Sequence, residues 1–240
     1  MFYFFVKFVI LWVPLHLFFR PWVQGKKNIP KKGAAIFASN HISFSDSIFL
    51  PLVVSRKITF LAKIDYWRGK GIRGFFTKLF FNGVGQVPVD RAGGSAAESA
   101  LNTAIKILND GKFLGIYPEG TRAPDGRLYR GRTGVARMAL EAQVPVIPVA
   151  MIGTYEIQPP GQAIPNLGRV GVRFGKPLDF SQHYGEAKNV EVLRKVTNEI
   201  MQAIHKLSGQ EYVDIYASNA KEILKKGKKI QDELNKEGEN

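Results

Sequence analysis

Short apolar runs alternate with amphipathic helical patterns along most of this 240-residue chain, and this alternation is the feature that most limits its fold. Six runs predict buried strands, at residues 34–39, 58–63, 83–89, 113–117, 144–153 and 169–175. Helical patterns occupy residues 45–54, 66–81, 95–111, 133–143 and 190–209, and a further helix is expected from Tyr212. Strands that alternate with helices favour an α/β domain with a mostly parallel central sheet flanked by helices. Sites in such sheets gather beyond the carboxyl ends of the strands.

The first 19 residues are apolar almost throughout, interrupted by Lys7, Pro14 and His16. A helix needs roughly 20 apolar residues to cross a bilayer, so this segment is at the lower limit of a span. We expect residues 1–24 to form a membrane-anchoring or docking segment that spans the bilayer or lies in one leaflet, with a buried core helix as the alternative. Basic residues that would face anionic cytoplasmic-leaflet lipid follow, namely Arg20, Lys26, Lys27, Lys31 and Lys32.

Charge and composition narrow the class of protein. The formal net charge of +14 predicts a polyanionic partner, which is nucleic acid, an anionic membrane or a phosphorylated substrate. The chain has no cysteine, which excludes disulfides, a thiolate nucleophile and Cys-ligated metal. It also lacks a Gly-x-Ser-x-Gly elbow, a His-Glu-x-x-His pair and a P-loop. Serine hydrolases, zinc hydrolases and P-loop enzymes are therefore disfavoured.

The stretch "SNHISFSD" follows the strand at residues 34–39 and holds His41 and Asp46. Residues five apart on one helix point about 140° from each other. The two side chains can therefore meet only if His41 lies in the turn and Asp46 in the first helical turn, where Ser43 and Ser45 suit a capping role. Asp46 would then fix one imidazole tautomer and stabilise its protonated form. From these residues alone, a polar helix cap beside an unrelated histidine is the more common outcome.

Two more strand exits carry basic residues. Residues 117–137 hold five arginines, with Asp125 the one acid between them, and Arg91 follows the strand at residues 83–89. Arginine makes bidentate contacts with phosphate oxygens, so Arg91 and Arg122 together suit a phosphate clamp. Lys63, at the end of the strand at residues 58–63, is a weaker candidate for the same role. A solvated basic loop is the plain alternative.

Four blocks of the sequence together resemble the glycerolipid acyltransferase superfamily, and within it the bacterial 1-acyl-sn-glycerol-3-phosphate (lysophosphatidic acid) acyltransferases. The blocks are "NHISFSD", "VPVDR", "YPEGTR" and "VPVIPVA"; they occur in family order, and the resemblance covers roughly residues 36–174. Val89-Asp90 and Ala123 depart from common family residues without removing a reactive group. The resemblance implies a glycerol-3-phosphate-acyltransferase-like fold, with a membrane segment at 1–24, a catalytic domain at 25–210 and a basic helical tail at 211–240.

The same resemblance implies an activity. An acyl group would pass from acyl-CoA or acyl-ACP to the 2-hydroxyl of 1-acyl-sn-glycerol-3-phosphate, giving phosphatidic acid. His41 would be the general base and Asp46 its orienting partner. The acceptor-binding positions implied by the family motifs are Arg91, Glu119, Gly120, Thr121 and Arg122. A carboxylate beside phosphate would be repelled, so Glu119 is expected to orient an arginine or bind a glycerol hydroxyl.

The expected partners follow from this activity. They are the bilayer, a lysophospholipid acceptor and acyl-CoA or acyl carrier protein, with no cofactor, no metal and no nucleic acid. The expected location is the cytoplasmic face of the cell membrane. The alternatives are an acyltransferase for glycerol-3-phosphate or another lysophospholipid, and a non-catalytic basic protein that binds membranes or nucleic acid. The nucleic-acid alternative leaves the apolar N-terminus and "YPEGTR" unexplained.

Overall fold

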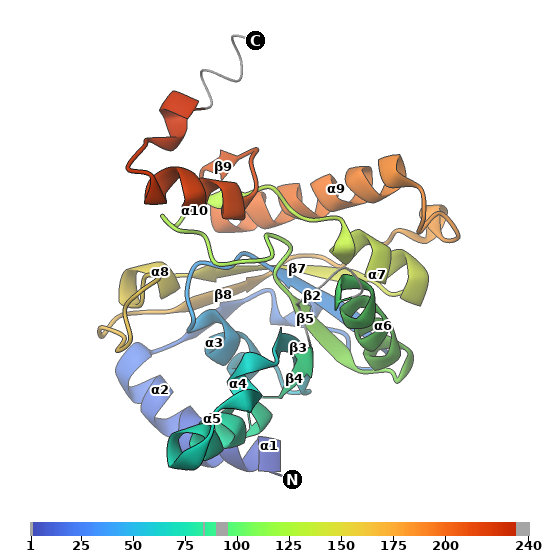
Figure 1. Ribbon diagram of the computed structural model, residues 1–240. Helices are drawn as coiled ribbons and strands as arrows, with labels where there is room; N and C mark the ends of the chain where they lie inside the picture. The colour runs from blue at the N-terminus through green and yellow to red at the C-terminus, as the bar shows by residue number, and fades with distance from the viewer. Residues whose placement is uncertain (1, 84, 90–95, 234–240) are drawn as a thin grey trace.

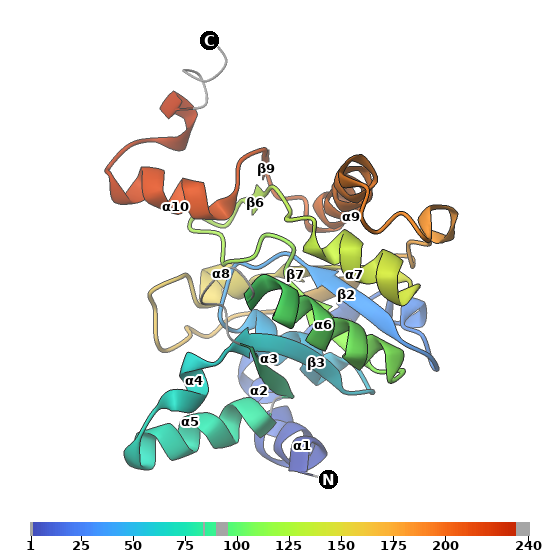
Figure 2. The same cartoon turned by 45° about the vertical axis from the view of Figure 1, so that its right-hand side comes forward.

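The computed structural model describes residues 2–83, 85–89 and 96–233. A seven-stranded sheet in the order β1-β8-β7-β2-β5-β3-β4 forms its centre (Figures 1 and 2). The strands are β1 (Trp22–Gln24), β2 (Ala35–Ser39), β3 (Ile58–Lys63), β4 (Gln86–Val89), β5 (Phe113–Ile116), β7 (Val146–Ile152) and β8 (Gly171–Phe174). The strands β7, β2, β5, β3 and β4 are parallel neighbours. The predicted α/β fold with a mostly parallel sheet is therefore confirmed.

One side of the sheet departs from the parallel pattern. Strand β8 pairs antiparallel with β7, and β1, which has no counterpart among the six predicted strands, pairs parallel with β8. A parallel neighbour needs a crossover connection, usually a helix, whereas an antiparallel neighbour does not. Between β7 and β8 the only helix is the four-residue α8 (Thr154–Ile157), which matches the antiparallel pairing.

The helices follow the predicted segments with shifts of a few residues at their ends. They are α1 (Phe2–Phe5), the π-helical η1 (Val6–Leu11), α2 (Trp12–Phe19), the 3₁₀ turn η2 (Lys26–Asn28), α3 (Asp46–Val53), α4 (Asp65–Arg68), α5 (Gly71–Gly83), α6 (Ala96–Asn109), α7 (Gly134–Ala142), η3 (Ser181–His183), α9 (Val190–Ser208) and α10 (Ala217–Lys225). Residue Ser95, the start of the predicted helix at residues 95–111, lies outside the described residues. At the other end, Gly111 takes a positive φ of 73° just beyond the last helical residue.

The core has two halves, one on each face of the sheet. Successive side chains of a strand point to opposite faces, and β2 places Ile36 and Ala38 on one face and Ala35 and Phe37 on the other. Helices α6, α7 and α9 cover the first face, and α3 and α2 cover the second. Because β2 is fully buried on both faces, the loop that follows it starts from a rigid point.

The C-terminal segment begins differently from the expected helix at Tyr212. Residues Tyr212–Val213 form strand β9, which pairs in parallel with β6 (Leu128–Tyr129), and the helix α10 starts later. The segment also packs onto the loops beyond β2 and β5. The apolar cluster that joins them contains Ile42, Ala123, Tyr129, Val213, Ala217, Ala220 and Ile230.

The N-terminal helices lie against the domain and leave a broad apolar surface exposed. The Lys7 side chain is buried, and its Nζ donates a hydrogen bond to the Val54 carbonyl at the end of α3. Helices α1, α2 and α5 gather at one end of the molecule, opposite α9 and α10 (Figures 1 and 2). Exposed apolar residues at this end are Phe4, Phe5, Phe8, Val9, Ile10, Trp12, Val13, Leu17, Phe18, Ile72, Phe75 and Leu79. Across the described ranges, no helix combines the length and apolar character that crossing a bilayer requires.

Candidate active site

The sheet brings two sequence blocks together at one edge. Strands β2 and β5 are parallel neighbours in the register Ile36↔Leu114 and Ala38↔Ile116, so their carboxyl ends lie side by side. His41 follows β2 by two residues, and the loop "YPEGTR" starts directly after β5. Strand β3 pairs with β5 on the other side and ends at Lys63. The Lys63 side chain and the whole of Arg91 lie outside the described part of the structure, so their predicted roles stay predictions.

His41 and Asp46 lie in contact in the predicted arrangement, with His41 in the turn before the helix and Asp46 in its first turn. Asp46 is the first residue of α3, and His41 lies in the loop before it. The His41 Nδ1 atom lies 3.0 Å from Asp46 Oδ2. The same carboxylate oxygen accepts the backbone N–H groups of Ile42 and Ser43, each at 2.8 Å. With a carboxylate oxygen as its neighbour, Nδ1 carries the ring proton, which leaves Nε2 as the basic nitrogen.

The surroundings of His41 keep the imidazole neutral. Burial lowers the pKa of His41 below its usual value and outweighs Asp46, which raises it, while the Arg122 and Lys221 charges lower it further. The ring stacks on Tyr117, with centroids 3.8 Å apart and planes 11° from parallel. The Tyr117 hydroxyl in turn lies 2.9 Å from Ser47 Oγ on α3. A neutral, rigidly held imidazole is the form that can accept a proton.

Glu119 holds the main chain of His41. Its carboxylate is fully buried; Oε1 accepts the His41 N–H at 2.9 Å, and Oε2 accepts the Tyr129 N–H at 3.0 Å. The Ala123 N–H donates to the His41 carbonyl at 2.7 Å. Both main-chain polar groups of His41 are thus fixed by the loop after β5. Among the described residues Glu119 forms no ion pair with an arginine, and it does not line the cavity beside His41; its expected contact with a glycerol hydroxyl stays a prediction. Burial raises the pKa of Glu119 to about 8.

Polar residues on either side of His41 bind distant backbone groups. Asn40 Nδ2 donates to the Met151 carbonyl at 3.0 Å, and Asn40 Oδ1 accepts the Met151 N–H at 2.7 Å, which joins the exit of β2 to β7. Ser43 Oγ donates to the Gln158 carbonyl at 2.8 Å, and Ser45 Oγ donates to Gln158 Oε1. Helix α3 has no side-chain cap at its N-terminus. Ser45 occupies the N-cap position but its side chain makes no cap bond there, so its predicted capping role is wrong. Ser43 Oγ accepts the Ser45 N–H at 3.1 Å, which places Ser43 in the capping region as predicted.

A cavity of about 450 Å³ opens beside this pair. His41, Thr121 and Arg122 line its polar side, together with Gly120 and Arg132. Gly120 has a positive φ of 76°, and a Cβ there would lie 3.0 Å from the Arg132 side chain, so glycine suits this turn. The apolar side is formed by Phe44, Ile48, Phe60, Leu61, Phe81, Val89, Leu114, Val135 and Met138. A cavity lined by both basic and apolar side chains suits an amphiphilic molecule with an anionic head.

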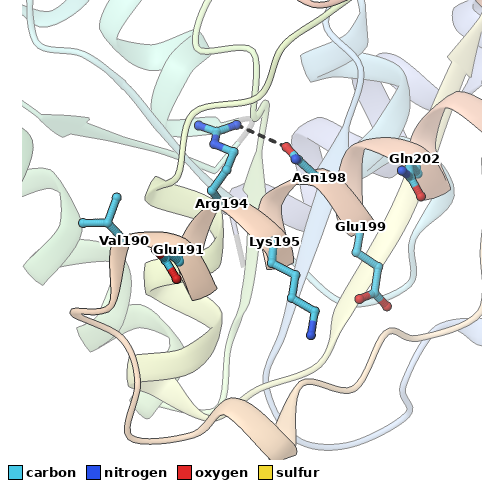
Figure 3. Close-up of a pocket in the computed structure, with 7 residues that line it drawn as sticks. All are labelled: Val190, Glu191, Arg194, Lys195, Asn198, Glu199 and Gln202. Carbon is cyan, nitrogen blue, oxygen red and sulfur yellow. Dashed lines mark hydrogen bonds between the residues drawn. The ribbon is translucent and has the colours of Figure 1, made fainter.

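A second, shallow concavity lies along α9, and His41 is not among the residues that line it (Figure 3). Its lining comes from this one helix, with Arg194 and Asn198 joined at 3.4 Å. Charges of both signs lie along it, as on a solvated helix face. Within the described ranges, no cluster of three or more metal-ligating side chains is present.

Three residues of the site were not singled out in the sequence. Tyr117 lies inside the third block, and the sequence shows that it is aromatic but not that its ring stacks on His41. Asn40 lies inside the first block, and its partner Met151 is 111 residues away. Lys221 lies on α10, and its Nζ donates to Thr121 Oγ1 at 2.6 Å. The Lys-rich composition of the tail was the only sequence signal for Lys221.

Comparison with known proteins agrees with this geometry. The chain is 30% identical over 176 residues to a chloroplastic 1-acyl-sn-glycerol-3-phosphate acyltransferase of Arabidopsis thaliana, covering 72% of this chain and 48% of that protein. It is 28% identical over 190 residues to a 1-acyl-sn-glycerol-3-phosphate acyltransferase of Bacillus subtilis, covering 78% of this chain and 88% of that protein. This chain thus spans about half the length of the plant relatives it matches.

A solved structure and a family model complete the comparison. The crystal structure of the 1-acyl-sn-glycerophosphate (LPA) acyltransferase PlsC from Thermotoga maritima matches with a TM-score of 0.60 and 27% identity. The match covers 86% of this chain and 87% of that one. The family model described as Acyltransferase matches residues 20–152, which include the His41–Asp46 pair and the Glu119–Arg122 loop. The chain belongs to the acyltransferase family.

Proposed function

We propose that this protein is a 1-acylglycerol-3-phosphate O-acyltransferase, which transfers a fatty acyl group from a thioester to the 2-hydroxyl of 1-acyl-sn-glycerol-3-phosphate and forms phosphatidic acid. One observation carries the proposal. The cavity is lined both by an arginine and by a neutral imidazole that a carboxylate supports, and most of its other lining residues are apolar. A base for a hydroxyl, a cation for a phosphate and space for an acyl chain are therefore available together.

His41 supplies the base that this reaction needs. A hydroxyl has a pKa far above neutrality, so it attacks a thioester slowly unless its proton is removed as the bond forms. Within the described residues, His41 Nε2 has no hydrogen-bond partner, and this nitrogen would take the proton from the 2-hydroxyl. The oxygen then attacks the thioester carbonyl, and the tetrahedral intermediate collapses as the C–S bond breaks. The thiolate leaves and receives the proton back from His41; such general-base assistance is worth about 10²–10⁴-fold in rate.

Asp46 and Glu119 act on the base rather than on the substrate. Asp46 keeps the proton on Nδ1 and stabilises the imidazolium that forms during transfer. Glu119 and Ala123 hold the His41 main chain between them. Because these hydrogen bonds exist before substrate enters, the base needs no rearrangement during the reaction.

Arg122 and Thr121 are proposed to bind the acceptor phosphate, with Arg91 and Lys63 retained as further candidates. Arg122 lines the cavity and forms no ion pair with a carboxylate in the described part of the chain. The Arabidopsis and Bacillus relatives are named for 1-acyl-sn-glycerol-3-phosphate, which supports the same acceptor here. Glycerol-3-phosphate and other lysophospholipids are the competing acceptors, and acyl-CoA and acyl-ACP are the two candidate donors.

We propose that the N-terminal end of the molecule binds the membrane without crossing it. The segment at residues 4–18 and α5 both expose apolar side chains at this end, where α1 contacts α5. Soluble proteins rarely expose large apolar patches unless these bind something. The exposed cations that follow the segment suit the anionic cytoplasmic leaflet. This arrangement would place the cavity where a lipid acceptor can enter from the bilayer.

The activity is tested with full-length protein in detergent or liposomes. Acyl-CoA and, separately, acyl-ACP are presented with 1-acyl-sn-glycerol-3-phosphate, glycerol-3-phosphate or a choline lysophospholipid, while free thiol and lipid product are followed. We expect thiol release with formation of phosphatidic acid, and a raised KM for the acceptor in Arg122→Ala. A preference for glycerol-3-phosphate would refute the acceptor assignment and leave the chemistry standing. Absence of transfer to all three acceptors would refute the function.

Membrane docking is tested by co-sedimentation with vesicles that contain anionic lipid. Val13→Asp places a charge on the apolar surface, where Val13 is 57% exposed. Val190→Asp is the matched control, since Val190 is 74% exposed but lies on α9 at the other end of the molecule. We expect Val13→Asp to reduce vesicle binding and Val190→Asp to leave it unchanged. Equal binding by both variants would contradict docking through this surface.

A further inference from the structure

Lys221 on helix α10 contacts the loop that contains Arg122. Lys221 Nζ donates to Thr121 Oγ1 at 2.6 Å, across 100 residues of sequence. The helix is fixed in place by the buried residues Ala217 and Ala220, which belong to the apolar cluster beyond β2. The Lys221 side chain is half-buried and lies outside residues 20–152, the part that the family model matches. Its position is thus set by tertiary packing and not by the shared motifs.

Three cations, Arg122, Arg132 and Lys221, lie near this point, and none has a carboxylate partner within the described residues. Neither Arg122 nor Lys221 forms an ion pair with a carboxylate among the described residues, and Arg132 Nη2 donates to Ser218 Oγ on α10 at 3.2 Å. Neighbouring arginines behave differently: Arg127 pairs with Asp125 at 2.7 Å, as surface cations commonly do. Burial and the charge of Arg122 lower the pKa of Lys221.

Glu119 is the acid whose charge acts on Lys221, but no ion pair joins it to these cations in the described part of the chain. Glu119 is close enough to raise the pKa of Lys221, but its two oxygens accept the backbone N–H groups of His41 and Tyr129. A cluster of cations that repel one another gains most from a ligand with two negative charges. A phosphate monoester carries nearly two charges near neutral pH, whereas a phosphodiester carries one.

We propose that Lys221 is a cation of the acceptor-phosphate site, so that α10 completes this site together with Thr121 and Arg122. The inference rests on the proposed function, because it takes the phosphate to lie beside Arg122. The ammonium that now bonds Thr121 Oγ1 would share its protons with a phosphate oxygen. The added charge favours phosphomonoester acceptors over lysophospholipids whose phosphate is a diester. The C-terminal segment would thereby set acceptor specificity.

The test measures binding without turnover, by calorimetry on full-length protein in detergent. The two ligands are 1-acyl-sn-glycerol-3-phosphate and the 1-acylglycerol that lacks phosphate. Lys221→Gln removes the charge and keeps a hydrogen-bond donor for Thr121, Lys221→Arg keeps the charge, and Lys225→Gln removes a charge from an exposed lysine on the same helix. Thermal unfolding of each variant verifies that α10 stays in place.

Loss of one charged hydrogen bond weakens binding by about tenfold or more. We expect this loss for Lys221→Gln with the phosphate-bearing lipid only, with most affinity kept in Lys221→Arg and all of it in Lys225→Gln. Equal affinities of Lys221→Gln and Lys225→Gln would overturn the inference, even if acyl transfer occurs. A protein that shows the expected binding pattern but transfers no acyl group would refute the proposed function and leave the phosphate site standing.

Discussion

Replacing Glu119 with glutamine tests whether Glu119 holds the main chain of His41 or binds the substrate. The Glu119 oxygens accept N–H groups from His41 at 2.9 Å and Tyr129 at 3.0 Å. A glutamine offers one oxygen and one NH₂ group, so one of these two backbone donors would face another donor. An unpaired buried donor costs about 1–3 kcal/mol. At pH 5, where Glu119 is protonated and its hydroxyl oxygen can still accept a hydrogen bond, a loss of about 2 kcal/mol lowers the Tm of a chain of this size by roughly 4–8 °C.

The kinetic consequence follows from the same contacts. Because both Glu119 oxygens are occupied, Glu119→Gln should leave KM for the acceptor unchanged, whereas kcat falls as the His41 main chain loses its support. Glu199→Gln, an exposed change on α9, is the matched control. An unchanged Tm with a raised acceptor KM would refute the reasoning, since it would show that Glu119 contacts the substrate.

The pH dependence of stability gives an independent check on Glu119. Burial raises its pKa from 4.5 to about 8, so between these values the folded chain keeps a proton that the unfolded chain has released. This contribution to stability is complete below pH 4.5 and is lost as pH rises towards 8, at about 1.4 kcal/mol per pH unit. Glu119→Gln cannot titrate, so the free energy of unfolding of the wild type relative to this variant should fall from pH 5 to pH 8 in chemical denaturation. A fall of about 4 kcal/mol would exceed the advantage at pH 5 and make the variant the more stable protein at pH 8. An advantage that is constant across this range would contradict the assignment.

Three further predictions concern His41, Asp46 and Lys7. Because the pKa of His41 is lowered, the acid limb of kcat/KM against pH should fall below pH 6.5, and a limb above that value would contradict a buried neutral base. Asp46→Asn should keep the imidazole in place, since an amide oxygen can still accept the Ile42 and Ser43 N–H groups. Because the negative charge is lost, kcat should fall by about 10²-fold or more. A kcat equal to that of the wild type would contradict this prediction. Lys7→Met should lower Tm, because the Val54 carbonyl loses its partner, and an unchanged Tm would show that this contact does not hold the N-terminal segment.

The sequence predicted the features that depend on local pattern. Strands β2, β3 and β7 were recognised as apolar runs, and the meeting of His41 with Asp46 followed from helical periodicity and the position of a turn. Both residues lie within one stretch of six, so their contact needs only the local chain path. The mostly parallel sheet followed from the alternation of strands and helices.

Contacts between distant segments could not be predicted in this way. Ser45 was expected to cap α3, but its hydroxyl donates to Gln158 Oε1 instead, and this contact depends on where α8 packs. Glu119 was assigned to substrate because its partners, two backbone N–H groups, have no sequence signature. Lys221 is one of many lysines in the tail, and only the packing of α10 selects it.

The central claim is that His41 removes the proton from the acceptor hydroxyl, and a single-turnover comparison of wild type with His41→Gln tests it most directly. Both proteins are saturated with 1-acyl-sn-glycerol-3-phosphate and acyl-CoA in detergent, and phosphatidic acid is followed against time, with Tm and acceptor Kd measured as controls. We predict about a 10²–10⁴-fold slower chemical step in His41→Gln, with folding and acceptor binding retained. A rate equal to that of the wild type would contradict the account.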